Sequence, residues 1–293
     1  MNQKIGFFTR GIAMGIADLI PGISGGTIAF ITGIYERLIL GIKSLNVVWI
    51  FYLLKFLFTG RTSAWHKTRV HFAKIDWFFF IPLALGIALA VFIGAHVISY
   101  LLDSYLAQTL SFFVGIIFLS LFFFQKHVEP ISQKTRLYFI LGSSIGVLLA
   151  IAIPTQTPST WWMYIISGFF GIFALFLPGI SGSYILLILG KYSEVLEVLI
   201  SPFSLLWLLF FFIIGAIAGM YIVSRIVSFL LHIAHDKTLY TLMGIILGSL
   251  LLPLSLIFEE FTLQFFFTVF LPFFLLGLVI PFSIHKYVEK KTN

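Results

Sequence analysis

The chain has 293 residues, of which 60% are hydrophobic and 10% are charged, and its mean hydropathy is +1.10. Soluble domains carry about 25% charged residues, so a water-soluble fold is excluded and the lipid bilayer must solvate most of this chain. The absence of cysteine excludes disulfides and thiolate metal sites. The net charge of +7 comes without a basic–aromatic motif, so it indicates membrane topology and no nucleic-acid partner. We expect neither a cofactor nor a metal.

The first apolar stretch, residues 5–40, is interrupted by the sequence Pro21-Gly22-Ile23-Ser24-Gly25. Proline and clustered glycines end a helix, and the freed backbone groups cannot face lipid. We therefore predict a re-entrant hairpin whose tip is buried near the midplane; two kinked full spans are the alternative. Residues 44–75, with Trp49, Tyr52, Lys55 and Trp65, are expected to form an amphipathic segment on the cytoplasmic surface. Three membrane spans are predicted to follow, at 77–102, 108–124 and 137–153.

The second half of the chain resembles the first. Pro178-Gly179-Ile180-Ser181-Gly182 repeats the first turn at an offset of 157 residues, and Gly215 repeats Gly86 at an offset of 129. A second hairpin at 161–199 and spans at 203–231, 238–257 and 262–284 complete the pattern. The predicted units are 1–155 and 156–293. Three spans are an odd number, so the second unit would insert upside down, as in many secondary transporters. The expected fold is an all-α polytopic membrane protein, an inverted repeat with two re-entrant helical hairpins and about six transmembrane helices.

Positive charge gives the orientation. Basic residues gather in loops 61–76 and 125–136, at Lys237 and in the C-terminal tail, whereas loops 103–107, 154–160 and 258–261 have no Lys or Arg. Both termini are therefore expected in the cytoplasm. Lys191 is the one basic residue on the opposite side.

Each Pro-Gly-Ile-Ser-Gly turn starts a new half-helix, whose free N–H groups and dipole favour an anion. Two such ends could enclose one phosphate or carboxylate group. The alternative is that the small residues only allow close helix packing. The candidate binding residues are Pro21, Gly22, Ser24, Gly25, Gly26, Thr27, Pro178, Gly179, Ser181, Gly182 and Ser183.

Charged residues inside apolar stretches are costly and often functional. Arg225, which the repeat pairs with His96, could bind a phosphate through its planar fork or extend to the headgroups instead. Asp18 or Glu36 could carry a coupling proton, or form an ion pair with Arg10 or Arg37. Glu194 takes the place of the Glu36–Arg37 pair in the second repeat.

An intramembrane serine hydrolase is a competing hypothesis, because Gly22-Ile23-Ser24-Gly25 and its second copy match the Gly-x-Ser-Gly pattern of rhomboid-type proteases. That mechanism needs a histidine base within hydrogen-bond reach of the serine. Only His96 lies inside a predicted span, and a nucleophile duplicated in inverted halves would be unusual. We therefore do not expect an enzyme.

The run from Met14 to Thr27, continuing to Gly33-Ile34-Tyr35-Glu36, resembles the N-terminal signature of the PopT-type polyprenyl-phosphate transporters, and residues 177–184 are similar to its second copy. The resemblance implies flipping of undecaprenyl phosphate across the bacterial cytoplasmic membrane, which recycles the lipid carrier of cell-wall sugars. It also implies a polyprenyl-phosphate partner, with protons or another ion as a candidate coupling partner. Leu175 stands where the first copy has Asp18, so a charge role there cannot be symmetric. A carrier of a small soluble anion remains the alternative.

Overall fold

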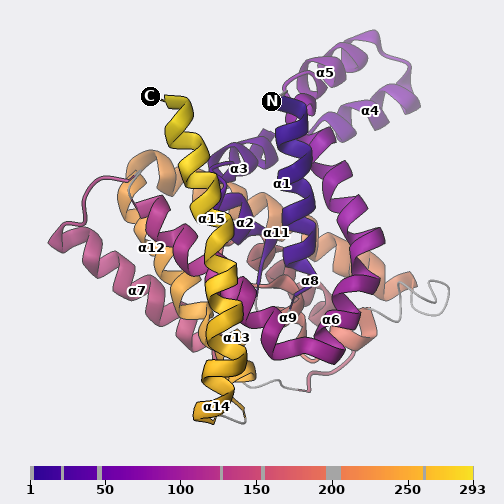
Figure 1. Ribbon diagram of the computed structural model, residues 1–293. Helices are drawn as coiled ribbons and strands as arrows, with labels where there is room; N and C mark the ends of the chain where they lie inside the picture. Colours follow the sequence, from indigo (N-terminus) through magenta and orange to yellow (C-terminus); the bar gives the residue numbers. More distant parts are fainter. Residues whose placement is uncertain are drawn as a thin grey trace.

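The structure is a computed structural model, and it describes residues 3–20, 23–44, 48–125, 128–152, 156–195, 206–259 and 262–292. Every regular element in these ranges is a helix, and the helices form one bundle with both chain ends at the same end of it (Figure 1). In the described part of the chain, five helices are long and apolar enough to cross a membrane, or six if one bent pair is a single span. The expected all-α polytopic membrane fold is confirmed.

The first hairpin is built from three helices: α1 (Gln3–Asp18), α2 (Gly25–Ile31) and α3 (Tyr35–Ser44). The chain between α2 and α3 bends by 120°. Gly33 makes this bend possible because its φ of +71° is a conformation that side-chain-bearing residues rarely adopt. The helix α3 lies near the end of the bundle at which α1 begins (Figure 1). The second arm of the predicted hairpin is thus broken once more, after only two turns of helix.

Residues of the predicted surface segment form two helices, α4 (Val48–Thr59) and α5 (Thr62–Phe72), which pack on each other and project from the bundle (Figure 1). Next comes α6 (Trp77–Gln125), which contains two predicted spans separated by a break at Tyr105 (φ −141°, ψ 42°). The third predicted span of this half is the helix α7 (Gln133–Ala150). It is not among the five apolar spans, because its first turn contains Lys134 and Arg136.

The second hairpin contains α8 (Trp161–Leu175) and α9 (Gly182–Ile188), and residues 196–199 of the predicted range lie outside the described residues. Then follow α11 (Leu206–Ile233), α12 (His235–Ser249) and α13 (Leu251–Ile257). The chain ends with α14 (Leu263–Phe265), the π-helix η1 (Phe266–Phe270) and α15 (Leu271–Thr292). The apolar spans here are Trp207–Ile233, His235–Ile257 and Leu263–Ser283, close to the three predicted ones.

Glycines bring the helices of two repeat-related pairs, α1 with α6 and α8 with α11, into backbone contact. A Cβ on Gly11 of α1 would lie 2.2 Å from the Leu83 carbonyl oxygen of α6, and a Cβ on Gly86 would lie 2.2 Å from the Phe8 carbonyl oxygen. The pair α8 and α11 makes the same kind of contact through Gly168 and Gly215, which would approach Phe212 and Ile165 to 2.0 and 1.9 Å. Gly168 follows Gly11 by 157 residues and Gly215 follows Gly86 by 129 residues, which are the two offsets of the predicted repeat. The opposite orientation of the halves stays a prediction.

Candidate functional site

The first turn carries a carboxylate at the start of its half-helix. Ser24 is the N-cap of α2, and its Oγ accepts a hydrogen bond of 3.1 Å from the Gly26 N–H. The Gly25 N–H donates to Asp18 Oδ1 at 2.6 Å. The side chain of Asp18 therefore sits where the free N–H groups and dipole favour an anion. Pro21 and Gly22 lie outside the described residues.

The second turn differs because it has no such carboxylate. Ser181 is the N-cap of α9, but its side chain accepts no capping hydrogen bond and instead lies 2.8 Å from Ser183 Oγ. Gly179 has a φ of +86°, and a Cβ there would lie 2.7 Å from the Ile246 Cα of α12. Only glycine fits this position. The buried Pro178 precedes it, and Leu175 ends α8 in place of an acid.

The two turns touch each other in the interior. The Gly179 N–H donates a buried hydrogen bond of 2.8 Å to Thr27 Oγ1. A Cβ on Gly26 would lie 3.0 Å from the Leu175 carbonyl oxygen, and the Tyr35 hydroxyl donates to the Phe176 carbonyl oxygen at 3.0 Å. Elements separated by about half the chain are thus joined by polar groups. Ser24, Thr27, Ser181 and Gly182 are buried, whereas Ser183 is exposed.

Arg225 and His96, which the sequence pairs through the repeat, are not joined to these turns by any interaction of the described residues. The Arg225 guanidinium lies 3.3 Å from the centre of the Tyr221 ring and donates to the Tyr221 carbonyl oxygen at 3.4 Å. The side chain of His96 is exposed on α6. Arg10 is half-buried on α1. Their roles in ligand binding stay predictions.

The acids of the first hairpin have partners that differ from the expected ion pairs with Arg10 or Arg37. Glu36 pairs with His235 at 2.8 Å, which links α3 to the start of α12. Arg37 pairs with Asp76 at 2.7 Å, and its guanidinium also lies over the Phe7 and Phe79 rings. Both pairs are partly exposed.

A cavity of about 690 Å³ lies beside these pairs. Glu36, Arg37 and Asp76 line it, together with Lys74 and with aromatic and aliphatic side chains of α2, α3, α6 and α12. Among the described residues, two positive and two negative side chains therefore face this space. Its charge balance does not single out an anionic ligand, so the turns remain the stronger candidate site.

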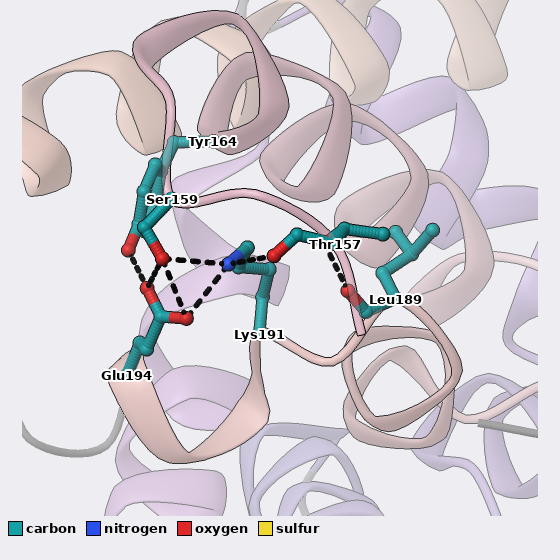
Figure 2. Close-up of polar contacts among 6 residues, drawn as sticks. All are labelled: Thr157, Ser159, Tyr164, Leu189, Lys191 and Glu194. Carbon is teal, nitrogen blue, oxygen red and sulfur yellow. Dashed lines mark hydrogen bonds and ion pairs between the residues drawn. The ribbon is translucent and has the colours of Figure 1, made fainter. Parts of the chain in front are cut away.

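Lys191 and Glu194 form a polar cluster at the base of the second hairpin (Figure 2). Lys191 is 0% exposed, and its ammonium donates to Glu194 Oε1 at 2.7 Å, to the Thr157 carbonyl oxygen at 2.9 Å and to Ser159 Oγ at 3.0 Å. The Tyr164 and Ser159 hydroxyls also donate to the Glu194 carboxylate. The cluster ties the segment before α8 to the turn after α9.

Lys191 is the one basic residue that the distribution of positive charge placed on the opposite side of the membrane, and in the structure it is buried and paired with Glu194. The cluster was missed because Ser159 and Tyr164 lie about 30 residues away in the sequence. The one available signal was the spacing of Lys191 and Glu194, which places them one helical turn apart.

A family described as undecaprenyl phosphate translocase-like matches residues 14–262 of the chain. A polyprenyl-phosphate transporter of Vibrio cholerae is 36% identical over 245 residues, which are 83% of this chain and 75% of that protein. A polyprenyl-phosphate transporter of Staphylococcus aureus is 29% identical over 260 residues, or 82% of this chain and 83% of that protein. No solved structure matches the chain. This multi-pass membrane protein belongs to the undecaprenyl phosphate translocase-like family.

Proposed function

We propose that the protein moves a polyprenyl phosphate, undecaprenyl phosphate in particular, between the leaflets of the bacterial cytoplasmic membrane. Membership of the family and the names of both relatives support this substrate. The structural observation that carries the proposal is the hydrogen bond between Thr27 and Gly179, because it places two half-helix starts together among apolar spans. A phosphate bound there would leave its prenyl tail in lipid. The return of the lipid carrier for reuse fits an inner-membrane location with both termini in the cytoplasm.

The proposed headgroup site consists of polar and small residues from both turns, together with an arginine on α11. A phosphate would accept hydrogen bonds from the N–H groups of α2 and α9 and from nearby hydroxyls. The residues are Ser24, Gly25, Gly26, Thr27, Ser181, Gly182, Ser183 and Arg225. A movement of Arg225 away from Tyr221 is part of this proposal, since its present contacts lie one turn earlier on α11. We propose that transport proceeds without covalent chemistry, with Ser24 and Ser181 donating hydrogen bonds to the phosphate.

The first test is flipping of a labelled polyprenyl phosphate in proteoliposomes. We expect Ser24→Ala, Thr27→Val, Ser181→Ala and Arg225→Ala each to slow flipping, by about tenfold where a hydrogen bond to the charged phosphate is lost. Ser144→Ala and Thr268→Val are matched controls, because both residues are exposed and each hydroxyl donates to the carbonyl oxygen four residues earlier. Wild type that moves no lipid phosphate under any ion gradient would refute the substrate. If a soluble phosphate or carboxylate inhibits flipping and is itself transported, the protein is better described as a carrier of soluble anions.

Asp18 is the proposed coupling group, because its carboxylate occupies the start of α2 that an incoming phosphate would need. Protonation would weaken its hold on the Gly25 N–H and free that donor for the ligand. We expect Asp18→Asn to abolish the response of flipping to a pH gradient, while Glu36→Gln, outside the turns, keeps it. An unchanged gradient response in Asp18→Asn would remove Asp18 from the coupling mechanism.

A further inference from the structure

The projecting pair α4 and α5 has an unusual charge distribution. Residues 37–75 contain seven Lys or Arg and no Asp or Glu. Five of these basic residues belong to the projecting segment, and all five side chains are exposed: Lys55, Arg61, Lys67, Arg69 and Lys74. At its base the acid-free stretch ends with Asp76, which pairs with Arg37 of the bundle. Within the projecting pair, therefore, no acidic side chain balances the positive charge.

The two helices divide apolar and basic character between them. The sequence of α4, VWIFYLLKFLFT, contains one charged residue in 12, whereas α5 reads TSAWHKTRVHF. A helix of this length extends about 18 Å, which is too short to cross a hydrocarbon core of about 30 Å. The apolar surface of such a helix that its neighbour does not cover can be buried by lying in the membrane interface.

The tip of the pair exposes large apolar side chains. Leu57 is 67% exposed and Phe58 is 85% exposed, next to the Gly60 turn that joins the helices. Ala64 and Thr68 of α5 are buried, and the Phe56 and Trp65 rings lie 5.2 Å apart between the helices. The pair therefore has its own small interface, and its tip is left for a partner outside the chain.

We infer that α4 and α5 form a docking arm for an anionic lipid surface. Leu57 and Phe58 enter the acyl-chain boundary, and Arg61, Lys67 and Arg69 contact anionic headgroups. Charge complementarity selects this partner over a neutral bilayer, since each basic residue near an anionic leaflet contributes a factor of about five to binding. The arm projects at the end of the bundle that holds both chain termini (Figure 1), so it docks on the leaflet to which the termini are exposed. This role is independent of the transported lipid.

The chain has no cysteine, so a single introduced cysteine can report on the arm in the full-length protein. We would label Phe58→Cys with an environment-sensitive fluorophore and reconstitute the protein in vesicles with and without phosphatidylglycerol. Quenchers attached to the acyl chains should reach this label in the anionic vesicles. Ser63→Cys is the matched control, because this exposed position lies outside the buried face of α5 that Ala64 and Thr68 form, and it should respond to aqueous iodide.

The basic residues are tested by adding Arg61→Gln, Lys67→Gln and Arg69→Gln to the labelled protein. Each lost charge should weaken docking by a factor of about five, so the three changes together should weaken it about 100-fold. Acyl-chain quenching at position 58 should then fall to its value in neutral vesicles. Quenching that is equal in neutral and anionic vesicles, or unaffected by the three changes, would overturn the anionic partner. A label at position 58 that stays open to iodide in every vesicle would overturn docking altogether.

Discussion

Replacing Gly215 with alanine is expected to destabilise the protein by about 3 kcal/mol, although it adds a single methyl group. The Cβ would lie 1.9 Å from the Ile165 carbonyl oxygen and 2.7 Å from the Ile165 carbonyl carbon. Both are backbone atoms of α8, so no side-chain rotation can relieve the clash, and α8 must move away from α11. Since α8 ends at the second turn, flipping should fail as well. The measurements are the thermal unfolding midpoint in detergent and flipping in proteoliposomes.

Gly94→Ala is the matched control on α6. The nearest atom to a Cβ there is Leu19 Cδ1 at 3.7 Å, an ordinary contact with a flexible side chain. Alanine in place of glycine inside a helix contributes about 0.5–1 kcal/mol, so this variant should be as stable as wild type or slightly more stable. Gly86→Ala, at the position that the predicted repeat aligns with Gly215, should behave like Gly215→Ala. An unchanged midpoint for both Gly86→Ala and Gly215→Ala would contradict the helix contacts described here.

The helix breaks were predictable because they depend on local chemistry. Proline and clustered glycines ended α1 and α8 where the two turns predicted, and Gly33 and Gly190 have positive φ at repeat-related positions. Five of six predicted spans are apolar helices in the structure. The prediction for α7 was less accurate, since its polar first turn belongs to the helix and lowers its mean hydropathy.

Contacts between distant segments were not predictable from local pattern. The bond between Thr27 and Gly179 depends on how two hairpins 152 residues apart in sequence pack together. Asp18 was identified as a charged residue with two possible roles, but its position on the Gly25 N–H depends on the path of the turn. Charge pairing failed for the same reason: Glu36 reaches His235, which is 199 residues away. A pattern gives the residue types at a site, and packing decides which of them meet.

Replacing Glu194 with alanine is expected to lower stability by about 3 kcal/mol or more, because it leaves the Lys191 ammonium buried without its counter-ion. Lys191 is 0% exposed, and its other hydrogen-bond partners, the Thr157 carbonyl oxygen and Ser159 Oγ, are both neutral. Isolated buried charges are far more costly than paired ones. The thermal unfolding midpoint in detergent should fall clearly, with loss of the second hairpin's fixed position and hence of flipping.

The double variant Lys191→Met/Glu194→Leu separates the cost of an unpaired charge from the value of the pair. Replacing both partners by apolar residues of similar volume is often close to neutral, so the double variant should be markedly more stable than Glu194→Ala alone.

Burial raises the pKa of the Glu194 carboxyl, but hydrogen bonds from Lys191, Tyr164 and Ser159 outweigh the effect of burial and hold the pKa below its ordinary value. The pair's contribution is therefore fully present above the ordinary pKa of a glutamate and is lost as the pH falls through the lowered one. Wild type should lose stability in that acidic range more steeply than the double variant, and parallel pH profiles would show that the pair contributes nothing to the pH dependence of folding.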